Sequence, residues 1–138
     1  MKISKLDAVT RQLDVAIDLL LSEKYTLAVI TLAGAAEEIL GVLAKNNGKD
    51  NMIDALKVLD KKLTGGRDFK ILNNEVNGLR NALKHANNLD EDFIDYDEDA
   101  PVAYLMRAIA NYTILGLTPN EKMKSIYLKV KNLQSESA

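Results

Sequence analysis

The sequence predicts an all-α protein, a single-domain antiparallel helical bundle of five to six helices. Three observations lead to this prediction. Glycine and proline are rare, with 7 and 2 copies in 138 residues. Apolar residues repeat at steps of three and four, and residues typical of helix ends bound each repeat. A chain of this length buries roughly two thirds of its unfolded surface, so it can form a core without disulfides.

Local end signals place six helices along the chain. Ser4 stands at an N-cap position, three residues before Asp7. Gly48 stops the second helix, and Pro101 lies near the start of the fifth. Thr118 begins a capping box for the last helix, with proline at the first helical position. The predicted helices run over about residues 4–21, 23–47, 50–63, 68–86, 101–115 and 118–133, with a frayed tail after 133.

Two of these helices stand out by their residue types. The second is apolar almost all round from 27 to 43 and rich in alanine and glycine. Small residues allow close approach of neighbouring helices, which predicts that this is the central helix of the bundle. The fourth carries a narrow apolar seam of the a/d type. The seam residues are Phe69, Leu72, Val76, Leu79, Leu83 and Ala86.

Composition excludes several kinds of chemistry. The chain has no cysteine, which removes disulfides, thiolate zinc sites and a cysteine nucleophile. It also lacks a phosphate loop, a paired-histidine metal site, a Ser-His-Asp framework and a dinucleotide glycine pattern. We therefore expect no metal and no cofactor. The net charge of −2 is too balanced to indicate polyanion binding from bulk charge. We expect a cytoplasmic protein that begins at Met1 and has no membrane segment.

The polar side of the fourth helix carries the candidate chemistry. Asparagine is a mediocre helix former, so its density here indicates a surface kept polar, either for a function or simply as a solvated face. On a helical wheel Arg80 borders the apolar seam, while Asn77, Asn81 and His85 follow one another in steps of four. His85 is the single histidine of the protein. Between 71 and 90 the asparagines are Asn73, Asn74, Asn77, Asn81, Asn87 and Asn88.

The string Arg80-Asn81-Ala-Leu-Lys84-His85 resembles the motif of the HEPN superfamily (higher eukaryotes and prokaryotes nucleotide-binding domains), in which arginine, a polar residue and then histidine lie late in a central helix of a compact antiparallel bundle. The stretch 31–40, with small residues and the acidic pair Glu37 and Glu38, is similar to a helix of many bacterial members. The resemblance implies a metal-independent endoribonuclease of toxin or phage-defence type, with RNA as substrate.

The resemblance also implies roles for single residues. His85 would be the general acid and base, because an imidazole side chain can both accept and donate a proton. Arg80 would clamp the phosphate, and Asn81 would orient the ring or contact a phosphate oxygen. Lys84, Asn77, Glu37 and Glu38 are candidates for substrate binding. Glu37 or Glu38 would pair with Arg80, or would be exposed capping or core-edge carboxylates.

Arg80 and His85 lie ~140° apart around one helix, so one chain cannot easily bring both to one phosphate. Members of the family form dimers with a composite cleft. We therefore expect a homodimer through the fourth helix, served by the apolar seam and the asparagine-rich face. The resemblance also implies a cognate antitoxin or another protein partner. One branch modifies a tyrosine two residues after the histidine; this chain has Asn87 there, so we do not expect that modification.

Two alternatives stay open at this level. Residues 90–99 form an acidic joint with seven carboxylates, which either repels RNA beside the cleft or is a solvated loop that favours the start of the fifth helix. The second function that fits is a non-catalytic dimeric helical module of the same fold, which binds a protein or nucleotide partner.

Overall fold

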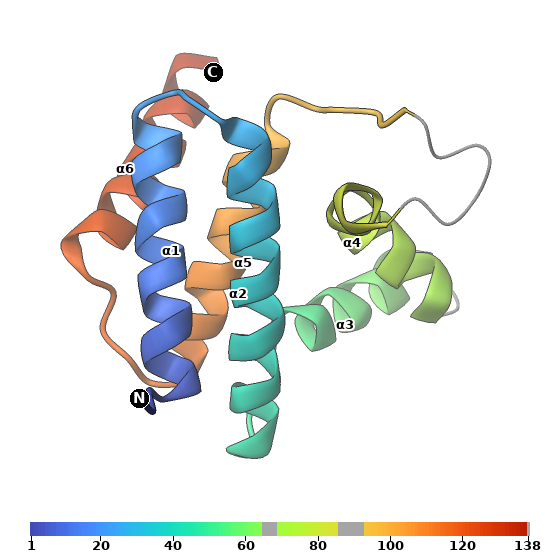
Figure 1. The fold of residues 1–138 in the computed structure, drawn as a ribbon. Coiled ribbons are helices and arrows are strands. Elements are labelled where there is room, and N and C mark those ends of the chain that lie inside the picture. Colours follow the sequence, from blue (N-terminus) through green and yellow to red (C-terminus); the bar gives the residue numbers. More distant parts are fainter. Residues whose placement is uncertain (65–68, 86–92, 138) are drawn as a thin grey trace.

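The computed structural model describes residues 1–64, 69–85 and 93–137 (Figure 1). In these parts of the chain it contains six α-helices and no strand. The predicted all-helical fold is therefore confirmed. The helices are α1 (Lys5–Leu21), α2 (Thr26–Asn46), α3 (Met52–Thr64), α4 (Phe69–Lys84), α5 (Ala100–Ile114) and α6 (Glu121–Ser137).

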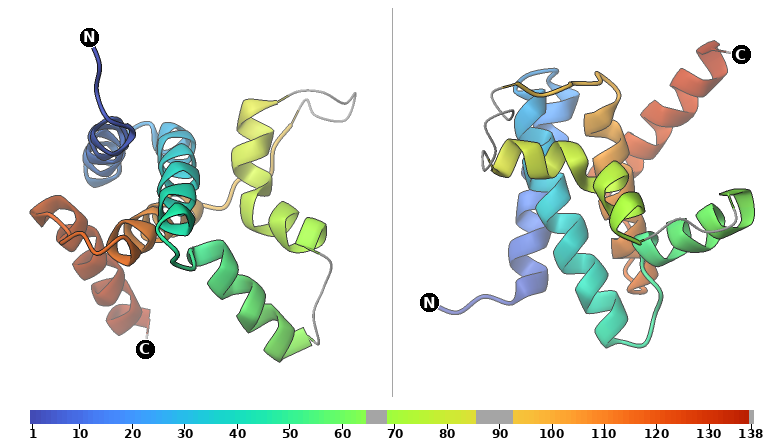
Figure 2. Two further views of the ribbon diagram at one scale, coloured as in Figure 1. Left: turned by 90° about the horizontal axis from the view of Figure 1, so that it is seen from below. Right: turned by 90° about the vertical axis from the view of Figure 1, so that its right-hand side faces the viewer.

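The core lies among α1, α2, α5 and α6, while α3 and α4 lie on the outer side of α2 (Figures 1 and 2). α2 packs against α1 on one side and α5 on the other, as its small residues predict. Figure 1 shows α1 antiparallel to α2, whereas α5 runs in the same direction as α2 because α3 and α4 intervene between them. The largest fully buried apolar side chains are Leu13, Ile17, Ile30, Leu40, Leu105, Met123 and Ile126.

Most helix ends follow the local signals. The Ser4 hydroxyl accepts a hydrogen bond from the Asp7 amide at 3.0 Å, which confirms the predicted N-cap. Gly48, with φ 72°, follows the end of α2 in the left-handed region that glycine tolerates best. α3 has a reciprocal cap, since the side chains of Asn51 and Asp54 each accept a hydrogen bond from the other's amide.

Three predicted ends were wrong. α2 begins at Thr26, because Ser22 still caps α1 and Glu23 and Tyr25 adopt positive φ in the turn. α6 begins at Glu121, because the Asn120 side chain accepts from the Met123 amide at 3.0 Å and so replaces Thr118 as the cap. The predicted fraying after 133 is also wrong, since α6 continues to Ser137.

α2 is long and apolar enough, by length and composition, to cross a membrane. Half of its most apolar stretch is buried inside the protein, and Glu37 and Glu38 interrupt it. The core helix of a soluble protein and a signal sequence pass the same test, and in this structure α2 packs against α1 and α5.

Candidate functional site

A polar pocket of about 210 Å³ opens between α2, α3, α4 and α5. It gathers acidic, basic and amide side chains from segments far apart in the sequence. Convergent polar groups in a concave site are typical of a binding site, so this pocket is the candidate functional site. Its lining residues are Glu37, Glu38, Gly41, Val42, Lys45, Asn51, Ile53, Asp54, Lys57, Asn77, Arg80 and Asn111.

One face of α2 builds the inner wall of this pocket. Gly34, Glu37, Glu38, Gly41 and Lys45 follow one another at helical spacing, so their positions lie on one side of α2. The two glycines make space for neighbouring side chains. A Cβ at position 34 would lie within 2.7 Å of the Arg80 side chain, and one at position 41 would lie 3.1–3.2 Å from two asparagine side-chain amides.

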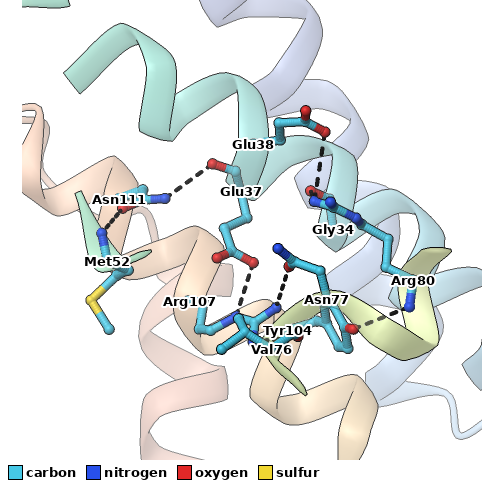
Figure 3. Close-up of polar contacts among 10 residues, drawn as sticks. All are labelled: Gly34, Glu37, Glu38, Met52, Val76, Asn77, Arg80, Tyr104, Arg107 and Asn111. Carbon is cyan, nitrogen blue, oxygen red and sulfur yellow. Dashed lines mark hydrogen bonds and ion pairs between the residues drawn. The ribbon is translucent and has the colours of Figure 1, made fainter. Parts of the chain in front are cut away.

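Glu37 is the buried charge of the site. Its side chain is 3% exposed, and its Oε2 lies 2.9 Å from Arg107 Nε. Burial raises the pKa of Glu37, although the positive charges of Arg107 and Arg80 oppose this rise. The backbone carbonyl of Glu37 accepts a hydrogen bond from Asn111 Nδ2 at 3.0 Å. The Oδ1 of Asn111 accepts from the Met52 amide at 2.8 Å, so this asparagine joins α2, α3 and α5 (Figure 3).

Arg80 reaches from α4 across Gly34 of α2 (Figure 3). Its Nη1 donates to the Gly34 carbonyl at 3.3 Å and lies 3.6 Å from Glu38 Oε2. Its side chain is 16% exposed, while that of Glu38 is 62% exposed. The prediction that Glu37 or Glu38 pairs with Arg80 is therefore met by Glu38, at the rim of the pocket.

Two side chains of α5 enter the hydrogen-bond ladder of α4. An α-helix joins the amide of residue i to the carbonyl of residue i−4, which here are Arg80 and Val76. The Arg80 amide donates to the Tyr104 hydroxyl at 3.1 Å, and the Val76 carbonyl accepts from Arg107 Nη1 at 2.9 Å. α4 bends in this region (Figures 1 and 2), and such an insertion is a known cause of helix kinks.

The Arg107 guanidinium thus contacts four residues at once. Besides Glu37 and Val76, its Nη2 donates to Asn77 Oδ1 at 3.4 Å, and its guanidinium carbon lies 4.4 Å from the centroid of the Tyr104 ring. A planar guanidinium with several donors suits such a junction, whereas a lysine ammonium does not. Arg107 therefore fixes the bend of α4 relative to α2.

The structure brings four predicted site residues to the pocket, namely Glu37, Glu38, Asn77 and Arg80. The other three lie elsewhere at the end of α4. Asn81 is half-buried, and Lys84 and His85 are exposed. His85 follows the last helical residue rather than lying within the helix, although its amide still bonds the Asn81 carbonyl at 3.0 Å. Asn87 and Ala86 lie outside the described residues.

Sequence reasoning missed Arg107, Tyr104 and Asn111. A signal was present, because Arg107 and Asn111 are four residues apart on an otherwise apolar helix and lie on one face of it. A buried carboxylate on an apolar α2 also requires a cationic partner. The packing of the helices decides which cationic side chain pairs with Glu37. The amino-acid sequence of each helix does not show this packing.

Packing also involves the apolar seam of α4 and the acidic joint before α5. Leu79 and Leu83 of the apolar seam are partly buried against the core of their own chain. On the α5 side, Asp95, Asp97 and Asp99 of the acidic joint line a second cavity. Tyr96 of the joint bonds the Thr26 hydroxyl at 2.7 Å, which ties the joint to the start of α2.

No family model, curated protein or solved structure matches this chain. Within the described residues, no group of three or more histidine or acidic side chains is placed to hold a metal ion.

Proposed function

We propose that this protein is a metal-independent endoribonuclease, active as a homodimer in the cytoplasm. The observation that supports this proposal is the setting of the string from Arg80 to His85. Arg80 is held against α2 by Gly34 and Glu38, so its guanidinium has a fixed position. His85 is exposed just beyond α4, where its ring is accessible to a substrate.

The residue types suit RNA cleavage. Neutral His85 takes the proton of a 2′-hydroxyl, and the 2′-oxygen forms a bond to the adjacent phosphorus. The bond from phosphorus to the 5′-oxygen then breaks, and a protonated imidazole gives that oxygen its proton. The products are a 2′,3′-cyclic phosphate and a 5′-hydroxyl. Arg80 stabilises the extra negative charge of the pentavalent intermediate.

A second copy of the chain completes the proposed site. Arg80 contacts Gly34 and Glu38 of α2, whereas His85 lies beyond the end of α4. A twofold contact between the C-terminal ends of two α4 helices would place the Arg80 of one copy near the His85 of the other. Ala82, Lys84 and His85 are exposed at this end, while Leu79 and Leu83 serve the chain's own core.

One observation favours a second candidate, a non-catalytic module that binds a protein such as a cognate antitoxin. The Arg80 guanidinium pairs with Glu38, which is the arrangement expected of a structural arginine. In that case Arg80 holds α4 to α2, and the exposed end of α4 is an interaction surface.

The test is a cleavage assay with structured and unstructured RNA in EDTA. The variants are His85→Ala, Arg80→Ala and Arg80→Lys, with Arg11→Ala as a matched control because Arg11 is exposed on α1. We expect the control to cleave like the wild type and the other three to lose activity at least 100-fold, with cyclic phosphate ends in the wild-type products. Cleavage by His85→Ala at the wild-type rate would exclude the proposed mechanism. Absence of cleavage by the wild type would favour the binding module.

A further inference from the structure

The pocket contains one buried acceptor that the fold leaves without a partner. Glu37 Oε1 is the single buried side-chain polar atom without a hydrogen-bond partner in the described part of the chain. The other carboxylate oxygen, Oε2, accepts a hydrogen bond from Arg107 Nε at 2.9 Å (Figure 3). Rotation of the carboxylate to bring Oε1 to this donor would break that hydrogen bond. Leaving a buried acceptor unpaired is costly, and Glu37 lines the pocket.

The side-chain amides of Asn51 and Asn111 do not offer Oε1 a donor. Asn51 Nδ2 donates to the Gly41 carbonyl at 3.3 Å, and Asn111 Nδ2 donates to the Glu37 carbonyl at 3.0 Å. Their side-chain oxygens accept backbone amides of α3. These two side chains form a wall whose polar groups already have partners, so neither of them supplies a donor to Oε1.

Charge and shape narrow the class of ligand. The negative charge of Glu37 is already balanced by Arg107, which favours a neutral N–H donor over a second cation. Gly41 has no side chain on this wall, and Val42 and Ile53 add apolar surface. The volume of about 210 Å³ equals that of roughly seven waters at ~30 Å³ each. A flat, neutral ring that carries an N–H group fits these conditions.

We infer that this pocket binds an unpaired nucleobase with an exocyclic amino group, whose N–H donates to Glu37 Oε1. This inference rests on the proposed function, since it assigns the pocket to a base of the RNA substrate. Single-stranded bases are commonly recognised through their Watson–Crick edges in protein pockets. Uracil lacks an amino group, and its N–H lies between two carbonyls that would face the carboxylate.

The experiment is a titration of the full chain with cytidine, adenosine, guanosine or uridine, each added alone. Binding is monitored by the amide chemical shifts in NMR spectra. We expect cytidine, adenosine or guanosine to shift resonances of the pocket residues, and uridine to bind at least tenfold more weakly. Glu37→Gln can keep the Arg107 contact but presents an N–H to the ligand, so it should weaken binding at least tenfold. Val42→Trp blocks the pocket from a half-exposed position, so it tests the inference without a change in the core.

Asp18→Asn is the control, because Asp18 is an exposed carboxylate paired with Lys122 far from the pocket. It should bind like the wild type. Absence of pocket shifts with all four nucleosides, or unchanged binding by Val42→Trp, would overturn the inference. Cleavage of RNA by a wild type that binds no nucleoside would overturn the inference alone. Binding without cleavage would overturn the nuclease and leave the base pocket standing.

Discussion

Arg107 Nε lies 2.9 Å from Glu37 Oε2, inside the contact between α5 and α2. This pair joins two of the four helices that form the core, and the same guanidinium donates to the Val76 carbonyl of α4. The bend of α4 and the position of Arg80 therefore depend on a buried ion pair. The sequence around Glu37 or around Arg107 does not indicate that these two residues pair.

Removal of Arg107 should strongly destabilise the fold. Arg107→Ala leaves Glu37 buried without its counter-charge, which costs about 3–5 kcal/mol. The measurement is the free energy of unfolding in urea. The double variant Arg107→Met with Glu37→Gln should lose less than the single one, because no buried charge remains. An equal loss in both would show that the charge is not the cause.

Stability should depend on pH through Glu37. Burial raises its pKa above the usual 4.5, so the folded state holds the proton more tightly than the unfolded state. The protonated Glu37 contributes fully to the free energy of unfolding below pH 4.5. This contribution is lost as the pH rises through the pKa of Glu37 in the folded state. We measure the melting temperatures of the wild type and of Glu37→Gln from pH 4 to 8. The melting temperature of the variant should rise relative to that of the wild type as the pH increases. A constant difference would contradict the raised pKa.

The Tyr104 hydroxyl should hold the bend of α4 together with Arg107. Tyr104→Phe removes the partner of the Arg80 amide at a cost of about 0.5–1.5 kcal/mol. Amide hydrogen exchange of Arg80 should change more than that of α1 or α5. Tyr127→Phe is the matched control, because Tyr127 is exposed on α6. The same exchange pattern in both variants would remove the assigned role.

Gly34→Ala should displace Arg80. The added Cβ lies within 2.7 Å of its side chain, whereas alanine favours the helix by up to about 1 kcal/mol. We expect a modest change in stability together with a loss of the proposed RNA cleavage. Gly78→Ala is the control, since a Cβ there meets nothing within 4 Å. Wild-type cleavage by Gly34→Ala would show that the position of Arg80 does not matter.

The protein should be a dimer at micromolar concentration in light scattering. Ala82 is exposed on α4, and Ala82→Arg would place like charges together at the proposed twofold contact. We expect this variant to be monomeric and inactive, and Val15→Arg, on an exposed position of α1, to stay dimeric. A monomeric wild type would exclude the composite site.

The sequence by itself determined the helices, because their signals are local. Apolar repeats, the Ser4 cap and Gly48 each act within a few residues, and the structure agrees with them. Where two local signals competed, as Thr118 and Asn120 did before α6, the pattern chose the wrong cap. The string from Arg80 to His85 was also readable, since it lies within one segment.

Only the tertiary structure decided which of these side chains meet. Glu37 and Glu38 are adjacent in sequence, yet Glu37 is buried and pairs with Arg107, whereas Glu38 lies at the rim of the pocket and pairs with Arg80. The pocket, the bend in α4 and the setting of Glu37 all depend on contacts between residues 24 to 74 positions apart in the sequence. Such contacts depend on how helices pack in space, and helical periodicity describes only which side of each helix is apolar.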